Sequence, residues 1–238
     1  MTTIAGNLQG LRARLEQACA AAGRDVKSVT LLAVSKTFGP DDVALAVDAG
    51  QRVFGENYIQ EGIEKVLALR HLRPDPPLQW HCIGPVQSNK TRLVAEHFDW
   101  VQSVDRLKIA QRLNDQRPDG LPQLQVCLQV NVDGGLNKSG VPPEEVMELA
   151  QAVAALPRLR LRGLMCIPEP AEGFEAQRTL FARARTLFDR LNAQGMALDT
   201  LSMGMSDDLD AAVAAGSTLV RVGRAVFGYR APKPAAAG

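Results

Sequence analysis

The chain has 238 residues, of which 46% are hydrophobic and 22% charged, and its formal net charge at pH 7 is +1. These values are typical of a soluble globular protein with a sizeable core, and they give no indication of a surface that binds nucleic acid or an anionic membrane. The N-terminus lacks the pattern of a secretory signal, and no segment approaches the roughly 18 apolar residues of a membrane span. We therefore expect a cytoplasmic protein.

The first elements of the chain set a pattern that later segments repeat. Residues 4–20 are predicted to form a helix, because apolar residues recur there at helical spacing. Residues 29–35 are apolar almost throughout, as in a strand that is buried on both faces. A second helix is expected to begin at residues 40–42, where a proline is followed by two acidic residues.

The unit of a strand followed by a helix recurs to the end of the chain. The further strands are expected at residues 52–55, 78–83, 99–103, 124–131, 161–166, 199–203 and 218–222. The helices between them are expected at residues 57–70, 88–96, 105–116, 143–155, 174–193 and 206–215. With the first strand included, eight strands alternate with helices, which favours parallel strands joined by helical crossovers.

This alternation predicts one α/β domain, a (β/α)8 barrel of the TIM type with an extra helix at its N-terminus. An open doubly wound sheet is the alternative, because it also alternates strands with helices. The chain contains no linker, so the single domain is predicted to span residues 1–230. Residues 231–238 form a tail of low complexity, which is expected to be disordered.

Polar residues gather where the predicted strands end, and in barrels the active site lies at the carboxyl ends of the strands. Lys36 directly follows the first strand. We expect its side chain to lie at the barrel mouth, partly removed from water, which favours the neutral amine that forms a Schiff base. The alternative is a solvated lysine at the end of a strand.

The segments that follow the last two strands have the features of an anion site. SMGMSDD is a turn that opens a helix, and VRVGRA is a strand that runs through a glycine into another turn. Backbone N–H groups at such places bind anions, and barrels often hold a phosphate there. The candidate residues are Ser202, Ser206, Gly223 and Arg224. Ordinary turns, with Ser206 capping a helix, are the alternative. Together with Lys36, these loops predict a phosphorylated aldehyde as ligand.

Other reactive residue types do not indicate a second site. The histidines lack metal spacing, and His81 in the third strand is interpreted as a core residue. The four cysteines are widely spaced, so buried thiols are expected rather than disulfides or a zinc site. Asp207 and Asp208 are interpreted as charges in the first turn of a helix, and Met203 and Met205 as packing residues. No metal site and no catalytic residue is predicted.

Six segments are similar in sequence, order and spacing to motifs of the pyridoxal phosphate homeostasis protein family: LLAVSKT, FGENYIQEG, WHCIGPVQSNK, LRGLM, LSMGMSDDLDAAVAAGST and VRVGRAVFG. The resemblance runs from about Ile4 to Tyr229. It implies a single-domain barrel similar to the N-terminal domain of alanine racemase. It also implies that the chain binds pyridoxal 5′-phosphate.

The resemblance gives each candidate residue a role. Lys36 matches the lysine that holds the cofactor as a Schiff base. Arg221 matches the arginine that faces the pyridine nitrogen, and an arginine there is expected to keep that nitrogen unprotonated and to limit carbanion chemistry. The remaining matches are Ser202, Ser206, Gly223 and Arg224 beside the phosphate, and Asn57 and Met203 beside the ring. Many relatives have a small hydroxyl residue at the position of Arg224.

The resemblance favours a protein of vitamin B6 homeostasis that carries the cofactor without catalytic turnover. A racemase-like enzyme is one alternative, but it needs a second group opposite the cofactor, and only Tyr58 and Tyr229 are candidates. A Schiff-base aldolase is the other, and Glu56 is the obvious carboxylate at the mouth for its acid/base step. We expect a monomer that makes transient contact with pyridoxal phosphate-dependent enzymes.

Overall fold

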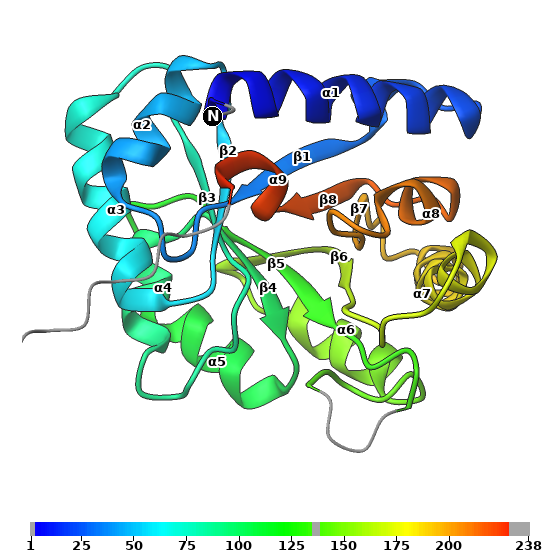
Figure 1. Ribbon diagram of the computed structural model, residues 1–238. Helices are drawn as coiled ribbons and strands as arrows, with labels where there is room; N and C mark the ends of the chain where they lie inside the picture. The colour runs from blue at the N-terminus through cyan, green and yellow to red at the C-terminus, as the bar shows by residue number, and fades with distance from the viewer. Residues whose placement is uncertain (1–2, 135–138, 229–238) are drawn as a thin grey trace, which may run out of the picture.

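The structure is a computed structural model that describes residues 3–134 and 139–228. It is a closed barrel in which eight strands follow one another in chain order. The last strand pairs in parallel with the first, since Thr30 lies opposite Leu219. Helices surround the strands (Figure 1). The predicted (β/α)8 barrel is therefore confirmed, and the open sheet is excluded.

The strands lie close to their predicted ranges. They are β1 (Thr30–Val34), β2 (Val53–Glu56), β3 (Gln79–Cys82), β4 (Trp100–Val104), β5 (Leu124–Gln129), β6 (Leu159–Met165), β7 (Thr200–Ser202) and β8 (Leu219–Val222). The strand expected at 124–131 ends at Gln129, because Val130 forms only an isolated bridge with Val141. The strand expected at 161–166 begins earlier, since Leu159 already pairs with Leu124.

The helices also follow the predicted alternation. They are α1 (Ile4–Ala21), α2 (Pro40–Asp48), α3 (Ile59–Leu72), α4 (Thr91–His97), α5 (Leu107–Gln116), α6 (Val146–Ala154), α7 (Phe174–Ala193), α8 (Leu209–Ala214) and α9 (Arg224–Phe227), with a 3-10 turn at Val26–Ser28. The predicted turn after the last strand is instead the short helix α9. Four residues make about one helical turn, which is too short to show a periodic pattern. The predicted tail lies outside the described residues.

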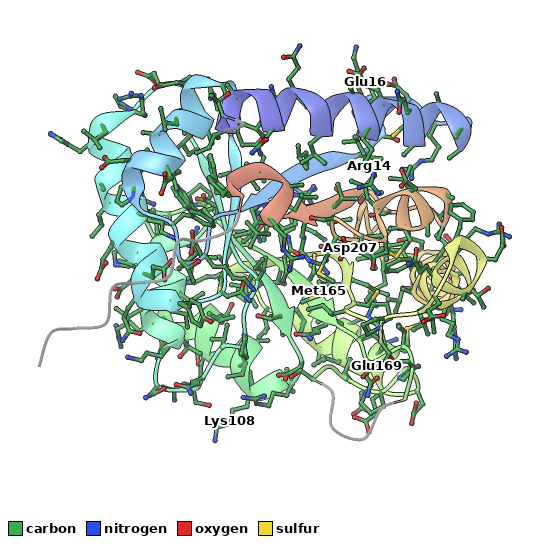
Figure 2. All side chains as sticks on the ribbon, viewed as in Figure 1. Arg14, Glu16, Lys108, Met165, Glu169 and Asp207 are labelled. Carbon is green, nitrogen blue, oxygen red and sulfur yellow. The ribbon has the colours of Figure 1, made fainter. Side chains whose placement is uncertain are left out.

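The extra N-terminal helix α1 supports the loops at the other end of the chain. Asn7 Nδ2 donates a hydrogen bond to the carbonyl oxygen of Val226 at 2.9 Å, in α9. Arg14 Nη1 donates to the carbonyl oxygen of Ser206 at 2.6 Å, and Arg14 lies on the side of α1 that faces α8 (Figure 2). Its other terminal nitrogen pairs with Asp210 at 2.6 Å. Thus α1 fixes the segments that follow both β7 and β8.

Clusters of buried apolar residues stabilise the barrel, and two of them include residues of β1. The larger one joins buried residues of the helices to the strands and includes Ala33 of β1. A smaller one contains Leu32, Val34, Ile83 and Leu219. Because successive side chains of a strand point to opposite faces, Leu32 and Val34 face the barrel interior while Ala33 faces the helices.

The predicted state of the cysteines is confirmed. All four are buried and free of disulfide bonds. Burial raises the pKa of the Cys82 thiol to about 12, and it does the same for Cys127. Such thiols are poor nucleophiles, because only the thiolate reacts. None of the helices in the described ranges has both the length and the apolar character of a membrane span.

Gly163→Ala is expected to lower the free energy of unfolding by about 1–3 kcal/mol or more. A Cβ atom at Gly163 would lie 1.6 Å from the carbonyl oxygen of Thr200, its partner across β6 and β7. That oxygen cannot move away without disturbing the strand pairing. Chemical denaturation measures the change. Gly120→Ala is the control, because nothing lies within 4 Å of its Cβ position. Equal stability of both variants would contradict the close approach.

Candidate functional site

Candidate residues at the carboxyl ends of the strands line a cavity of about 570 Å³. Lys36 and Arg221, from the first and last strand regions, line it together. Six of the eight residues expected to bind the cofactor line the cavity: Lys36, Asn57, Ser206, Arg221, Gly223 and Arg224. The barrel closure therefore brings together residues from both ends of the chain.

Lys36 lies at the mouth as predicted, but its side chain is exposed rather than partly removed from water. The preceding residue, Ser35, is fully buried. The following residue, Thr37, has a φ of +70°, in the left-handed region that β-branched residues rarely adopt. The backbone N–H of Thr37 donates a hydrogen bond to the Glu61 carboxylate. The backbone on both sides of Lys36 is therefore held firmly, while its amine remains accessible.

A buried charged cluster lies beneath this loop. Lys65 is 2% exposed, and its Nζ donates to Glu56 Oε1 at 2.8 Å and to Glu61 Oε1 at 2.6 Å. It also donates to the carbonyl oxygen of Ser35 at 2.7 Å, and the Ser35 hydroxyl donates to Glu56. Burial raises the pKa of Glu56 above its usual range, although Lys65 acts in the opposite direction. Glu56 is therefore a structural residue beneath the mouth and not the free acid/base group of the aldolase alternative.

Arg221 combines burial with access to the cavity. Its side chain is 4% exposed, and it lines the cavity from β8. Nη1 donates to Ser202 Oγ at 2.6 Å, and Nη2 donates to the carbonyl oxygen of Cys166 at 2.9 Å. Burial lowers the pKa of Arg221 from its usual value, but a guanidinium stays charged in proteins. Because it has five N–H donors, it retains donors for a ligand.

The loops after β7 and β8 form the end of the cavity with Ser206 and Gly223. Ser206 does not cap a helix, since the N-cap of α8 is Asp208, whose Oδ1 accepts a hydrogen bond from the Met205 N–H at 2.6 Å. Asp207 and Asp208 thus precede the helix rather than forming its first turn, and Asp207 lines the cavity. Gly223 is the N-cap of α9, and its carbonyl oxygen accepts hydrogen bonds from the N–H groups of Val226 and Phe227 at 2.9 and 3.0 Å.

Two expected residues are not at the cavity surface. Ser202 and Met203 are fully buried and do not line the cavity. Ser202 lies beneath Arg221, and Met203 packs in the larger apolar cluster. Ser202 ends β7 and Met203 directly follows it, where alternating side chains point into the barrel or toward the helices. Met205 is 42% exposed and lines the cavity, although the sequence assigned it to packing.

Apolar residues of the cavity were missed by the sequence analysis. They are Val34, Phe38, Ile83 and Ile167. Each lies at or shortly after the end of a strand. Phe38 also stacks on Phe227 of α9, with ring centroids 5.0 Å apart. The same positional rule, applied to apolar residues, would have found them.

The remaining candidates lie away from the cavity. His81 is fully buried, as predicted for a core residue, and stacks on Trp100 with centroids 4.8 Å apart. Tyr58 is 56% exposed, and Tyr229 lies outside the described residues. Among the described residues, no group of three His, Cys, Asp or Glu side chains is placed to hold a metal ion.

Comparison with known proteins gives consistent similarities. Residues 6–231 match the family described as alanine racemase, N-terminal domain. A pyridoxal phosphate homeostasis protein from Pseudomonas aeruginosa is 59% identical over 230 residues, covering 97% of each chain. One from Escherichia coli strain K12 is 52% identical and covers 97% of this chain and 98% of its own. The solved structure of PipY from Synechococcus elongatus, with PLP bound, is 39% identical with a TM-score of 0.82, and covers 95% of this chain and 100% of that one.

Proposed function

Since the chain belongs to the alanine racemase N-terminal domain family and, within it, to the pyridoxal phosphate homeostasis proteins, we propose that it binds pyridoxal 5′-phosphate as a Schiff base on Lys36. One observation carries the proposal. The accessible amine of Lys36 and the buried guanidinium of Arg221 line the same cavity. The residues that form the phosphate end, Ser206 and Gly223, line it as well.

The cavity fits this cofactor in size and in chemistry. Its volume of about 570 Å³ is within the range of roughly 300–1,000 Å³ for small-molecule sites. Lys36 supplies the amine, Arg221 supplies donors for the ring nitrogen, and Arg224 supplies positive charge near the phosphate. Asn57 Oδ1 is buried and has no hydrogen-bond partner within the described part of the chain, so a polar group of the ligand would satisfy it.

The residues of the chain limit the reactions that the site supports. The bound cofactor would supply an aldehyde for the amine and an electron-withdrawing ring. Arg221 would donate hydrogen bonds without giving up a proton to the ring nitrogen, because a guanidinium stays charged in proteins. That nitrogen then stays unprotonated, and the ring withdraws electrons weakly. We therefore infer a carrier of the cofactor in vitamin B6 homeostasis rather than an enzyme.

A panel of amino acids tests this inference. The loaded protein is incubated with each amino acid, and racemisation, transamination and decarboxylation are followed against free cofactor at the same concentration. Rates no higher than those of free cofactor are expected. Turnover well above them would support the racemase alternative.

Arg224→Glu and Ser206→Ala are expected to weaken binding of the phosphate without preventing Schiff-base formation at high cofactor concentration. Loss of a charge-assisted hydrogen bond would reduce affinity by roughly 10-fold or more in Arg224→Glu, and less in Ser206→Ala. Absorbance titrations with pyridoxal 5′-phosphate and with pyridoxal measure the effect. The preference for the phosphorylated form should shrink in both variants. Arg106→Glu, on an exposed residue outside the cavity, is the control. Unchanged preference in both variants would contradict the phosphate assignment.

We further propose that the protein is a cytoplasmic monomer that exchanges its cofactor through transient contact with pyridoxal phosphate-dependent enzymes. The exposure of Lys36 and Met205 at the cavity supports direct access from solvent. Light scattering after size-exclusion chromatography tests the monomer. Transfer is tested by mixing the loaded protein with a cofactor-free enzyme and following recovery of that enzyme's activity.

A further inference from the structure

A chain of hydrogen bonds runs through the barrel interior from Gln79, the first residue of β3, to Arg221. His81 Nε2 lies 3.0 Å from Gln79 Oε1, and Gln102 Nε2 lies 2.8 Å from His81 Nδ1. The Ser202 hydroxyl donates to Gln102 Oε1 at 2.6 Å, and Arg221 Nη1 donates to Ser202 Oγ at 2.6 Å. The four residues from His81 to Arg221 are each at most 4% exposed. These hydrogen bonds therefore lie in the protein interior, where a polar group that loses its partner lowers the stability of the fold.

The direction of every bond follows from Arg221. A guanidinium has only donors, so Ser202 Oγ accepts from it and the hydroxyl proton is donated onward. The acceptor is Gln102 Oε1, which leaves the amide N–H of Gln102 facing His81. His81 Nδ1 must then carry no proton, and Nε2 must carry the proton that Gln79 accepts. One orientation of each side chain therefore satisfies every hydrogen bond from Gln79 to Arg221.

The surroundings of His81 agree with this neutral form. The ring is fully buried against Trp100, and burial lowers its pKa to about 3. Arg162, whose guanidinium lies 4.7 Å from the Trp100 ring centroid, also disfavours the imidazolium. A neutral His81 accepts from Gln102 at neutral pH. An imidazolium would have no lone pair for that bond.

We propose that Gln102 is a positioning residue for the cofactor: it holds Ser202, which in turn holds the guanidinium of Arg221 in the cavity. This inference rests on the proposed function, because it concerns the group that faces the cofactor ring. Gln102 itself does not line the cavity. Its removal would leave the Ser202 proton without its acceptor, so that Ser202 would no longer fix the Nη1 end of Arg221.

The test compares Gln102→Leu with Gln51→Leu. Gln51 is 4% exposed, and its amide donates to the carbonyl oxygens of Leu31 and Val53 at 2.9 and 2.8 Å. Each substitution removes two hydrogen bonds of a buried amide, but only Gln102 belongs to the series of hydrogen bonds that reaches Arg221. Both variants are titrated with pyridoxal 5′-phosphate, and the pH dependence of the Schiff-base absorption band is recorded.

Gln102→Leu is expected to bind the cofactor roughly 10-fold more weakly and to shift the pH midpoint of the band, because Arg221 no longer sets the protonation of the ring nitrogen. Gln51→Leu should keep the wild-type midpoint even if it is less stable. Ser202→Ala replaces Gln102→Leu if the latter fails to fold, with the same expected shift.

Wild-type affinity and midpoint in Gln102→Leu would overturn the inference, as would an equal shift in Gln51→Leu. Nitrogen NMR of His81 in the cofactor-free protein gives an independent readout. A proton on Nε2 alone is expected, and a proton on Nδ1 would overturn the inference. Failure of the proposed function can be told apart from failure of this inference. The wild-type protein would then form no Schiff-base band, whereas NMR would still report which nitrogen of His81 carries the proton.

Discussion

Lys36→Ala is expected to abolish the yellow absorption band that wild-type protein shows with pyridoxal 5′-phosphate. The variant lacks the amine that forms the Schiff base at the cavity. Its fold should remain intact, because the Lys36 side chain is exposed and the buried contacts of the loop belong to Ser35 and Thr37. Absorption spectra before and after borohydride reduction measure the covalent bond, and peptide mass spectrometry identifies the modified residue.

Lys108→Ala is the control for loss of an amine. Lys108 lies on α5, exposed and pointing away from the barrel (Figure 2). This variant should keep the wild-type band. Circular dichroism should show the same unfolding transition for all three proteins. A colourless wild-type protein would contradict the proposed function, and a reduced cofactor on another residue would contradict the assignment to Lys36.

Lys65→Met is expected to lower the free energy of unfolding at neutral pH by about 3–5 kcal/mol, because it leaves a buried carboxylate without its cation. Lys65 is 2% exposed and Glu56 is fully buried. The difference in unfolding free energy between Lys65→Met and the wild-type protein should shrink as the pH is lowered, since Glu56 then takes up a proton and carries no charge. Cofactor retention should also fall, because Lys65 holds the carbonyl group of Ser35 next to Lys36. Urea denaturation at several pH values measures the first effect.

Two variants separate the charge from the size of the side chain. Lys108→Met makes the same substitution on an exposed residue and should change stability little. Lys65→Met combined with Glu56→Gln removes both charges and should recover part of the lost stability. A single Lys65→Met variant as stable as the wild-type protein at neutral pH would mean that the buried cluster does not hold the loop.

The strand and helix pattern of this fold could be predicted because strands buried on both faces and amphipathic helices leave strong local signals. The run before Lys36 and the long helix α7 are examples, and α7 spans the predicted residues 174–193. The short α9 could not be predicted, since its form depends on packing of Val226 and Phe227 rather than on local periodicity. The count of eight strands favoured a closed barrel but left an open sheet as the alternative, and the pairing of β1 with β8 decides between them.

The site was predictable where residues follow strands directly, as Lys36 and Asn57 do, or where the family motifs place them. Contacts between distant segments were not predictable. Lys65 reads in the sequence as an ordinary charged residue of a helix, yet it pairs with Glu56 from β2. Gln102 likewise reads as one polar position in a strand, and its bond to Ser202 joins residues far apart in the chain. Only the closed barrel brings such pairs together.

The pairing of the first strand with the last has a consequence for the protein during its synthesis. Lys36 leaves the ribosome well before Arg221 and Gly223, which follow it far along the chain. Chains are synthesised at about 5–20 residues per second, so for roughly 10–40 seconds the nascent chain has the reactive amine but neither the guanidinium nor the turn that completes the cavity. Cofactor capture is therefore expected only after β8 has been made, and a product truncated before β8 would carry its lysine at the edge of an unclosed sheet.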